Sequence, residues 1–368
     1  MISYFIPFIF LTILTLLESS KRFDFLIKNK YLYFLLALLF IVFIGFRYEI
    51  GCDWFPYKGL FEKYNSLSFM EIITSNFFEK IKLQELGHIL ITSISKNIYI
   101  LNLIYSALFI IPLFYFCSQL KRTYFSLLIS YPYYIIVVGM GPIRQSASIG
   151  LLMVSILLVS KRNYYKHFFL SIISSLLHQS SILFNALILG SFFSKIKKIK
   201  LSKKNILISI FISFILLYAL PTVLNKFLFY ITHYRYVDQE GIRLISPAKG
   251  AIFIWFINFF PSIIFLKNIT KFNFEKSLNK ILIILTTFEF LLLPIIFLNS
   301  VIAYRFLLYL FPSSILITSY IPDLKLLKLN KFYYLNIING LALISLIIWL
   351  NFAFHASCWV PYKNILLN

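Results

Sequence analysis

Of the 368 residues, 60% are hydrophobic and only 13% are charged, and the mean hydropathy is +0.85. A water-soluble domain can neither expose nor bury so much apolar surface, so the composition excludes the soluble classes and predicts an integral membrane protein. The net charge of +22 does not indicate nucleic-acid binding, because the Lys and Arg residues lie in short loops between hydrophobic runs.

Hydrophobic runs recur along the chain, and each approaches the roughly 20 residues that a helix needs to cross a bilayer. The runs are continuous, whereas the strands of a membrane barrel alternate between apolar and polar residues. The first run has no charge before it and no A-x-A-like cleavage site, so we expect a membrane helix there rather than a signal peptide. The predicted helices lie near residues 2–17, 31–46, 97–116, 124–138, 143–160, 205–220, 250–266, 281–298, 302–320 and 332–350.

The segment 167–193 differs from these runs. It carries His178, Gln179, Ser180 and Ser181 at its centre and has basic residues at both ends. Such flanks predict two short half-helices that dip into the membrane and return, with His178 at the turn; one long tilted helix is the alternative. With the pair counted as two, we expect one all-α, polytopic transmembrane domain over residues 1–368, with about 11–12 segments.

Loop charge predicts the orientation. Cytoplasmic loops carry an excess of Lys and Arg. Most of the 35 Lys and Arg residues lie in six predicted loops that all fall on one side: 21–30, 121–123, 161–166, 195–204, 267–280 and 321–331. This side is therefore predicted to be cytoplasmic, and both termini and the two larger loops, 47–96 and 221–249, are predicted to be on the outer side.

The chain has three cysteines, Cys52, Cys117 and Cys358, without CxxC or histidine spacing. Neither a disulfide framework nor a zinc site is indicated. Cys52 and Cys358 fall on the same predicted side and are able to meet there, but free thiols are the favoured prediction.

Four polar clusters lie where predicted helices reach the outer side. Charged side chains near the bilayer interior are costly unless paired or hydrated, so they are candidates for function. Three of the clusters contain an arginine, and a guanidinium binds phosphate oxygens bidentately, so one cavity lined by all four clusters suits a polyanion. The alternative is that each arginine snorkels to lipid phosphates or pairs with an acid. The clusters are Arg47–Tyr57, Gly139–Gln145, His178–Ser181 and Tyr304–Tyr309.

Three further side chains are open to two interpretations. His178 is able to act as a general base, since neutral imidazole titrates near pH 6.5, or to be a hydrogen-bonded structural residue. Glu289, within a membrane run, is a candidate proton carrier or catalytic group, or a buried ion-pair partner or protonated acid. Glu85 in the first outer loop is a candidate base or a solvated loop acid.

Short motifs follow one another along nearly the whole chain. They are Arg47 with Gly51, Asp53 and Tyr57; Glu85 with Gly87; Ile143-Arg144-Gln145; His178 to Ser181; Arg305-Phe306 with Tyr309; and Val360-Pro361-Tyr362. In this succession the sequence resembles the EpsG/Wzy-type family of bacterial polysaccharide polymerases. The outer segment 221–249 has no counterpart among these motifs.

The resemblance implies a GT-C-like glycosyltransferase of the bacterial inner (cytoplasmic) membrane, with its active site facing the periplasm. Such enzymes transfer a growing glycan from undecaprenyl diphosphate onto a newly flipped lipid-linked repeat unit, and so build O-antigen or another surface polysaccharide. The expected partners are the lipid-linked donor and acceptor, membrane lipid and a chain-length regulator protein. No cofactor is expected.

The outer loops carry no D-x-D-like metal motif, so we expect a metal-independent displacement at the anomeric carbon. Arg144 and Arg305 would hold the diphosphate, with Arg47 as a third contact. His178 is the predicted general base, with Asp53 or Glu85 as alternatives. The predicted substrate-binding set is Arg47, Arg144, Gln145, Arg305, Tyr57 and Tyr309.

Two other classes remain compatible with the sequence. A flippase or transporter of lipid-linked oligosaccharide also needs many helices and a cationic lumen, but transporters place polar residues near the bilayer midplane and show repeat symmetry. An O-antigen ligase or membrane acyltransferase would use a similar cavity, and only the acceptor would distinguish it.

Overall fold

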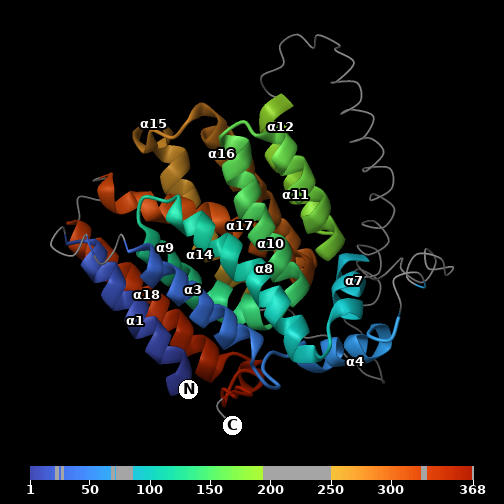
Figure 1. Ribbon diagram of the computed structural model, residues 1–368. Helices are drawn as coiled ribbons and strands as arrows, with labels where there is room; N and C mark the ends of the chain where they lie inside the picture. Colours follow the sequence, from blue (N-terminus) through green and yellow to red (C-terminus); the bar gives the residue numbers. More distant parts are fainter. Residues whose placement is uncertain are drawn as a thin grey trace. The chain divides into compact units, whose positions relative to one another are not determined.

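The computed structural model describes residues 1–20, 25, 29–67, 71, 86–193, 250–324 and 330–366, and these fold mainly into helices (Figure 1). They belong to two compact units. The first comprises Met1–Ser75, Leu86–Val154 and Ile315–Asn368, and the second comprises Asn76–Glu85 and Ser155–Ser314. The predicted helix 205–220 and the predicted outer loop 221–249 lie outside the described residues.

The first unit holds both ends of the chain. Its helices are α1 (Ile2–Glu18), α3 (Lys30–Gly45), α4 (Trp54–Tyr64), α7 (Leu86–Ile94), α8 (Ile98–Ser118), α9 (Thr123–Ser130), the π-helix η3 (Tyr131–Val138), η4 (Ile321–Asp323), α18 (Lys331–Phe352) and η5 (Ala356–Cys358). Helix α3 packs along α8, and α1 packs along α9.

The second unit is built from the middle of the chain. Its helices are α11 (Tyr164–Leu177), α12 (Ser181–Phe193), α14 (Gly250–Lys267), α15 (Ile269–Phe272) and α16 (Lys276–Leu298). Helix α16 packs against both α12 and α14. Two helices have residues in both units, α10 (Ile143–Ser160) and α17 (Ser300–Tyr320).

Six of the described helices are long and apolar enough to cross a membrane: α8, α10, α14, α16, α17 together with η4, and α18. Apolar helices of 10–17 residues add to them, α1 and α3 among them. The protein is therefore an all-α, multi-pass membrane protein, as predicted. The total of 11–12 segments includes the undescribed helix near 205–220 and stays a prediction.

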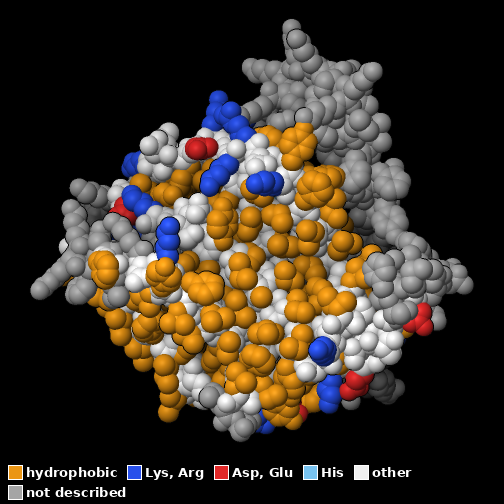
Figure 2. Space-filling view, in the orientation of Figure 1, with side chains coloured by type: hydrophobic (Ala, Val, Ile, Leu, Met, Phe, Trp, Pro, Cys, Tyr) orange, Lys and Arg blue, Asp and Glu red, His pale blue; other side chains and the backbone are white. Residues whose placement is uncertain are grey.

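The outer faces of the helices fit a lipid environment. On α18 a stripe of exposed apolar side chains recurs every three or four residues, at Ile337, Leu341, Ile344 and Ile348. Water-soluble proteins rarely expose apolar surface continuously, whereas a helix that faces acyl chains must. Figure 2 shows hydrophobic side chains over most of the face in view, with Lys and Arg near its edges.

The two ends of the first unit differ in charge and bonding. At one end Arg122 makes two hydrogen bonds to the Asp323 carboxylate, of 3.0 and 2.8 Å, and Lys121 and Lys331 lie 3.7 and 3.6 Å from the same carboxylate. The other end holds the N-terminal turn of α1, whose Tyr4 hydroxyl donates to the carbonyl of Trp359 at 2.6 Å. Residues 321–324 and 330–331, the described parts of one predicted basic loop, thus lie beside the predicted basic loop 121–123. The side of the membrane on which these loops lie stays a prediction.

The break in the 167–193 segment is where the sequence predicts it. Helix α11 ends at Leu177, His178 is in extended backbone, and α12 begins at Ser181. Helices of 14 and 13 residues span about 20 Å each, at 1.5 Å per residue, which is less than the bilayer core. They pack against each other, so the prediction of two half-helices is confirmed and the single long helix is excluded.

Candidate functional site

Arg47 lies in the loop between α3 and α4 and is 1% exposed. Its guanidinium donates from Nη1 to the carbonyl of Ile44 at 2.8 Å, from Nε to that of Ile50 at 3.1 Å, and from Nη2 to Oδ1 of Asn102 at 3.2 Å. Burial lowers the pKa of Arg47 to about 10, so the side chain is cationic at neutral pH. Arg47 therefore caps the C-terminal end of α3 and holds the backbone of the loop that follows. Its contact with a diphosphate stays a prediction.

Arg144 is the second residue of α10 and is half-buried. Its guanidinium carbon lies 5.5 Å from the ring centroid of Tyr57, a residue of α4 that is 6% exposed. Burial raises the pKa of Tyr57, and the Arg144 guanidinium opposes that rise. Asp53 precedes α4 and contributes to the electrostatic environment of both Arg47 and Tyr57. Two of the four predicted clusters, Arg47–Tyr57 and Gly139–Gln145, are thus in contact.

Gly51 is the point at which these two clusters touch. Its φ is +93°, a conformation that glycine adopts without strain and other residues avoid. A Cβ built on Gly51 would lie 2.1 Å from the carbonyl oxygen of Met140, in the turn just before α10. Only a residue without a side chain lets the loop that carries Arg47 and Asp53 lie directly on the turn that carries Arg144.

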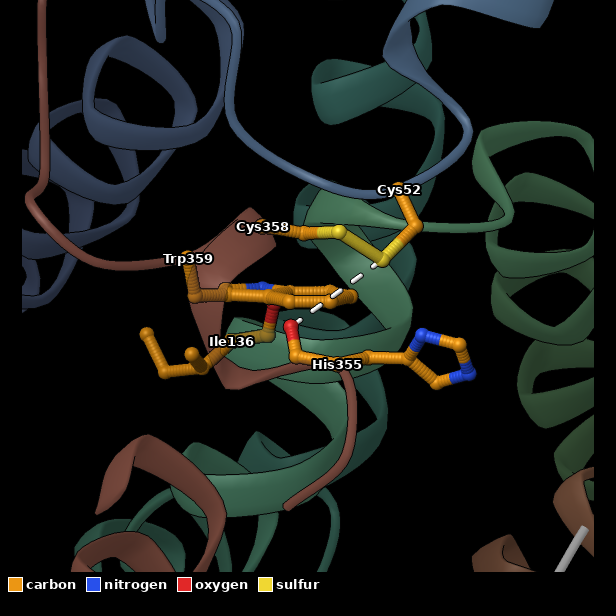
Figure 3. The surroundings of a disulfide bond; sticks show 5 residues. All are labelled: Cys52, Ile136, His355, Cys358 and Trp359. Atoms are coloured by element: carbon orange, nitrogen blue, oxygen red, sulfur yellow. Dashed lines mark hydrogen bonds between the residues drawn. A yellow bond between two sulfur atoms is a disulfide. The ribbon is translucent and has the colours of Figure 1, made fainter. Parts of the chain in front are cut away.

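Cys52 and Cys358 form a disulfide with a Cα–Cα distance of 5.1 Å (Figure 3). The favoured prediction of free thiols at these two positions is wrong. The two cysteines are 306 residues apart in sequence, so no spacing pattern signals the bond. Cys117 is a buried free cysteine in α8.

The disulfide is one of several bonds between the C-terminal segment Cys358–Asn364, here called the strap, and the loop after α3. The amide of Gly51 donates to the carbonyl of Cys358 at 2.8 Å, and that of Tyr48 donates to the carbonyl of Lys363 at 3.0 Å. Arg47 and Asn364 form an antiparallel β-bridge. The strap therefore holds the Arg47 loop along its whole length.

Aromatic residues fix the strap to the helices. The indole nitrogen of Trp359 donates to the carbonyl of Ile136 in η3 at 3.1 Å (Figure 3). Tyr362 stacks on Phe43 of α3 at 4.5 Å and donates its hydroxyl to the Phe43 carbonyl at 2.7 Å. The motif Val360-Pro361-Tyr362, noted only through the family resemblance, thus belongs to the strap, which holds the Arg47 loop and α3 in place.

His355 lies beside the same disulfide. One of its ring nitrogens and the sulfurs of Cys52 and Cys358 all lie within 4.8 Å of one another, a spacing at which three such groups are able to hold a metal ion. In the oxidised pair the sulfurs are bonded to each other and are not thiolates, which are the form that ligates metals. The sequence spacing gives no sign of this grouping.

The second unit carries the other predicted histidine. His178 is 8% exposed, and its Nδ1 lies 2.9 Å from the hydroxyl of Tyr309. The Tyr309 ring stacks on Phe184 of α12 at 4.6 Å, with 12° between the planes. His178 and Tyr309, predicted in separate clusters, are therefore direct partners.

Arg305 lies one turn before Tyr309 in α17, so the two side chains share one face of the helix, as predicted from their i, i+4 spacing. Arg305 is half-buried. The next residue, Phe306, contacts the same Phe184 ring at 5.7 Å. The first two clusters thus belong to one unit and the last two to the other. One cavity lined by all four clusters stays a prediction.

Two of the three remaining candidates, Gln145 and Glu289, are buried. Gln145 is 1% exposed at the start of α10. Glu289 is 1% exposed, and its Oε2 accepts a hydrogen bond of 2.6 Å from the hydroxyl of Ser262 in α14, while the indole of Trp255 donates to the Glu289 carbonyl at 3.2 Å. Glu85 lies outside the described residues.

A family model described as the EpsG family matches residues 30–364, nearly the whole chain and all the motifs described above. The chain belongs to the EpsG family. This is a family of Wzy-type polysaccharide polymerases, so the protein has a polymerase-type role in polysaccharide synthesis. Searches of curated proteins and of solved structures gave no match, and the GT-C-like architecture stays a prediction.

Proposed function

We propose that this EpsG-family polymerase joins undecaprenyl-diphosphate-linked repeat units into O-antigen or another surface polysaccharide, at the outer face of the bacterial inner membrane. The family match supports the reaction class. The observation that carries the site is Arg144, a half-buried guanidinium at the start of α10 that lies on the ring of Tyr57. A guanidinium so placed adds to the positive end of the helix dipole and suits a diphosphate.

The proposed reaction is a displacement at the anomeric carbon of the donor glycan. A hydroxyl oxygen of the acceptor sugar bonds to that carbon, the bond from the carbon to the phosphate oxygen breaks, and undecaprenyl diphosphate leaves as an anion. Arg144 and Arg305 stabilise the negative charge that develops on the diphosphate, in place of a metal ion. Arg47, as a third contact to the diphosphate, and Gln145, Tyr57 and Tyr309 are the remaining members of the proposed binding set.

The acceptor proton passes to His178 in this scheme. For Nε2 to accept it, Nδ1 must carry a hydrogen and donate it to the Tyr309 hydroxyl, which lies 2.9 Å away. Tyr309 then fixes the tautomer of His178 and the direction of its ring. Asp53 is the alternative base within the first unit, and Glu85 is the alternative outside the described residues.

Two independent features support the proposed orientation. Arg122 and Lys331, from two of the predicted basic loops, both contact Asp323, and cytoplasmic loops are those rich in Lys and Arg. The disulfide lies at the other end of the first unit, and disulfides persist where the compartment is oxidising. Arg47, Asp53 and Arg144 are therefore proposed to face the periplasm, where a chain-length regulator would also act.

The test is to delete the gene and complement it with the wild-type chain, with Arg144→Ala, or with Arg162→Ala. Arg162 is an exposed residue of the loop 161–166, so its removal controls for the loss of one positive charge. We expect Arg144→Ala to lower the polymer yield about 10²- to 10³-fold, the usual effect of removing one group that stabilises a developing anion.

Surface glycans that carry single repeat units without long chains support the proposal. Accumulation of lipid-linked units on the inner leaflet would instead identify a flippase. Long chains built normally but not attached to their final carrier would identify a ligase. Full activity of Arg144→Ala, at a normal protein level, would remove the diphosphate site.

A further inference from the structure

A second buried histidine, His88, lies near the Arg144 site and has no role in the proposed reaction. It is in α7, is 0% exposed, and its Nδ1 lies 2.8 Å from the hydroxyl of Tyr105 in α8. A buried imidazole must be hydrogen-bonded to offset its desolvation, and this contact does so. The contact also fixes the direction in which the imidazole ring points.

The imidazole ring of His88 also contacts the aromatic ring of Tyr57. The two ring centroids are 5.8 Å apart and the planes are inclined at 68°, an edge-to-face arrangement. Tyr57 carries the Arg144 guanidinium on its ring, 5.5 Å from the centroid. Four side chains from four helices therefore form a row, in the order Tyr105, His88, Tyr57 and Arg144.

The row has a clear physical consequence for Arg144. A free arginine side chain loses rotamer entropy when it binds an anion. A guanidinium that already lies on a fixed aromatic ring has lost part of that freedom before the anion arrives, which raises its affinity. Tyr57 is able to serve as such a platform only if its own ring is fixed, and the edge-to-face contact with His88 fixes it.

We propose that His88 is a positioning residue of the polymerase, which strengthens lipid-diphosphate binding by fixing Tyr57 beneath Arg144. The proposal rests on the proposed function, in which Arg144 contacts the diphosphate. His88 itself touches no substrate. Its effect is on donor affinity and not on the transfer step.

The experiment measures the Kd of undecaprenyl diphosphate for the purified full-length chain in lipid nanodiscs. We expect His88→Leu, which removes the ring, to weaken binding about 2- to 10-fold, the range expected for loss of one aromatic contact. His88→Phe keeps a ring against Tyr57 and should restore most of the affinity. Tyr105→Phe removes a single hydroxyl and should give an intermediate loss. Thermal unfolding of each variant checks that it is folded.

A double-mutant cycle separates positioning from a merely structural role. In an Arg144→Lys background, where no planar guanidinium lies on Tyr57, His88→Leu and Tyr105→Phe should change the Kd less than twofold if His88 acts through Arg144. Effects equal to those in the wild-type background would overturn the inference. An unchanged Kd for Arg144→Ala would instead show that the proposed function of Arg144 is wrong. Tyr105→Phe keeps the test decisive if His88→Leu does not fold.

Discussion

Among the described residues, a buried histidine with its Nδ1 against a tyrosine hydroxyl occurs in each of the two units, and the two pairs are built differently. His88 is inside α7, is 0% exposed and meets Tyr105 at 2.8 Å. His178 follows the last residue of α11, is 8% exposed and meets Tyr309 at 2.9 Å. Both histidines make the same contact. His88 lies within a helix, whereas His178 lies in the extended residue between α11 and α12.

This difference predicts different kinds of role. A fully buried histidine inside a helix, in contact with two aromatic rings, is proposed to act through those neighbours. A histidine in the extended residue between two half-helices has its Nδ1 held by a tyrosine hydroxyl and lies outside the regular helical backbone. The same residue type and the same hydrogen bond thus serve positioning in one unit and, as proposed, proton transfer in the other.

The largest expected effect comes from His178→Phe, compared with the matched change His88→Phe. Each variant keeps an aromatic ring and leaves one buried tyrosine hydroxyl without its histidine. We expect His178→Phe to lower the polymer yield about 10²- to 10⁴-fold, since a general base is lost. His88→Phe should stay within a few-fold of wild type. Gel analysis of surface glycan, normalised to the protein level, gives both values, and equal losses would end the distinction between the pairs.

Gly51→Ala should have the next largest effect, confined to the first unit. The added methyl group would collide with the Met140 carbonyl, and the φ of +93° disfavours alanine as well. We expect a loss of activity of about tenfold, in line with strain at a special backbone conformation. Hydrogen exchange should accelerate in residues 47–64 and stay unchanged in residues 164–193. Unchanged exchange in residues 47–64 would show that the loop does not depend on this close approach.

Tyr309→Phe sharpens the comparison within the second unit. Without the hydroxyl, the contact that is proposed to select the His178 tautomer with Nε2 as proton acceptor is lost. Because one hydrogen bond contributes a net 0.5–1.5 kcal/mol, we expect turnover to fall about 2- to 13-fold, in addition to any rise in the donor KM that follows from the place of Tyr309 in the proposed binding set. Steady-state kinetics on the purified polymerase separates the two constants. A change in KM alone would assign Tyr309 to donor binding.

The smallest effect on activity is expected from Cys52→Ser together with Cys358→Ser. Loss of the disulfide should lower the temperature of unfolding, since removal of such a bond typically costs about 2–4 kcal/mol. The remaining bonds between the strap and the Arg47 loop should preserve most of the polymer yield. Treatment of the wild-type chain with a dithiol reductant should have the same effect, and Cys117→Ala serves as the control. A normal unfolding temperature in the double variant would show that the bond is not formed in the protein.

Features set by local pattern could be predicted from the sequence. Basic residues on both sides of His178 gave the broken helix, and the spacing of Arg305 and Tyr309 placed both on one face of α17. Loop charge grouped Arg122 with the 321–331 loop. Each of these depends on residues close in the chain or on a rule about membrane sides.

Features that depend on contacts between residues far apart in the chain could not be predicted from the sequence. The bond of Cys52 to Cys358, the donation from Trp359 to Ile136 and the contact of His88 with Tyr57 all depend on how helices pack, and no spacing in the sequence encodes them. The partnership of His178 with Tyr309 has the same origin. The sequence predicts His178 and Tyr309 as site residues from their chemistry, but it does not predict the hydrogen bond that joins them.

The disulfide also bears on how the polymerase is made. Cys358 follows Cys52 by 306 residues, so at about 5–20 residues per second it is synthesised roughly 15–60 s later. During that interval the Arg47 loop is present without the strap that holds it. The loop therefore acquires these bonds only after α18 and the strap have been synthesised. A nascent chain that lacks the strap has Arg47 but not the disulfide and the backbone bonds that hold its loop, so we expect the proposed donor site to form only after the strap has been made.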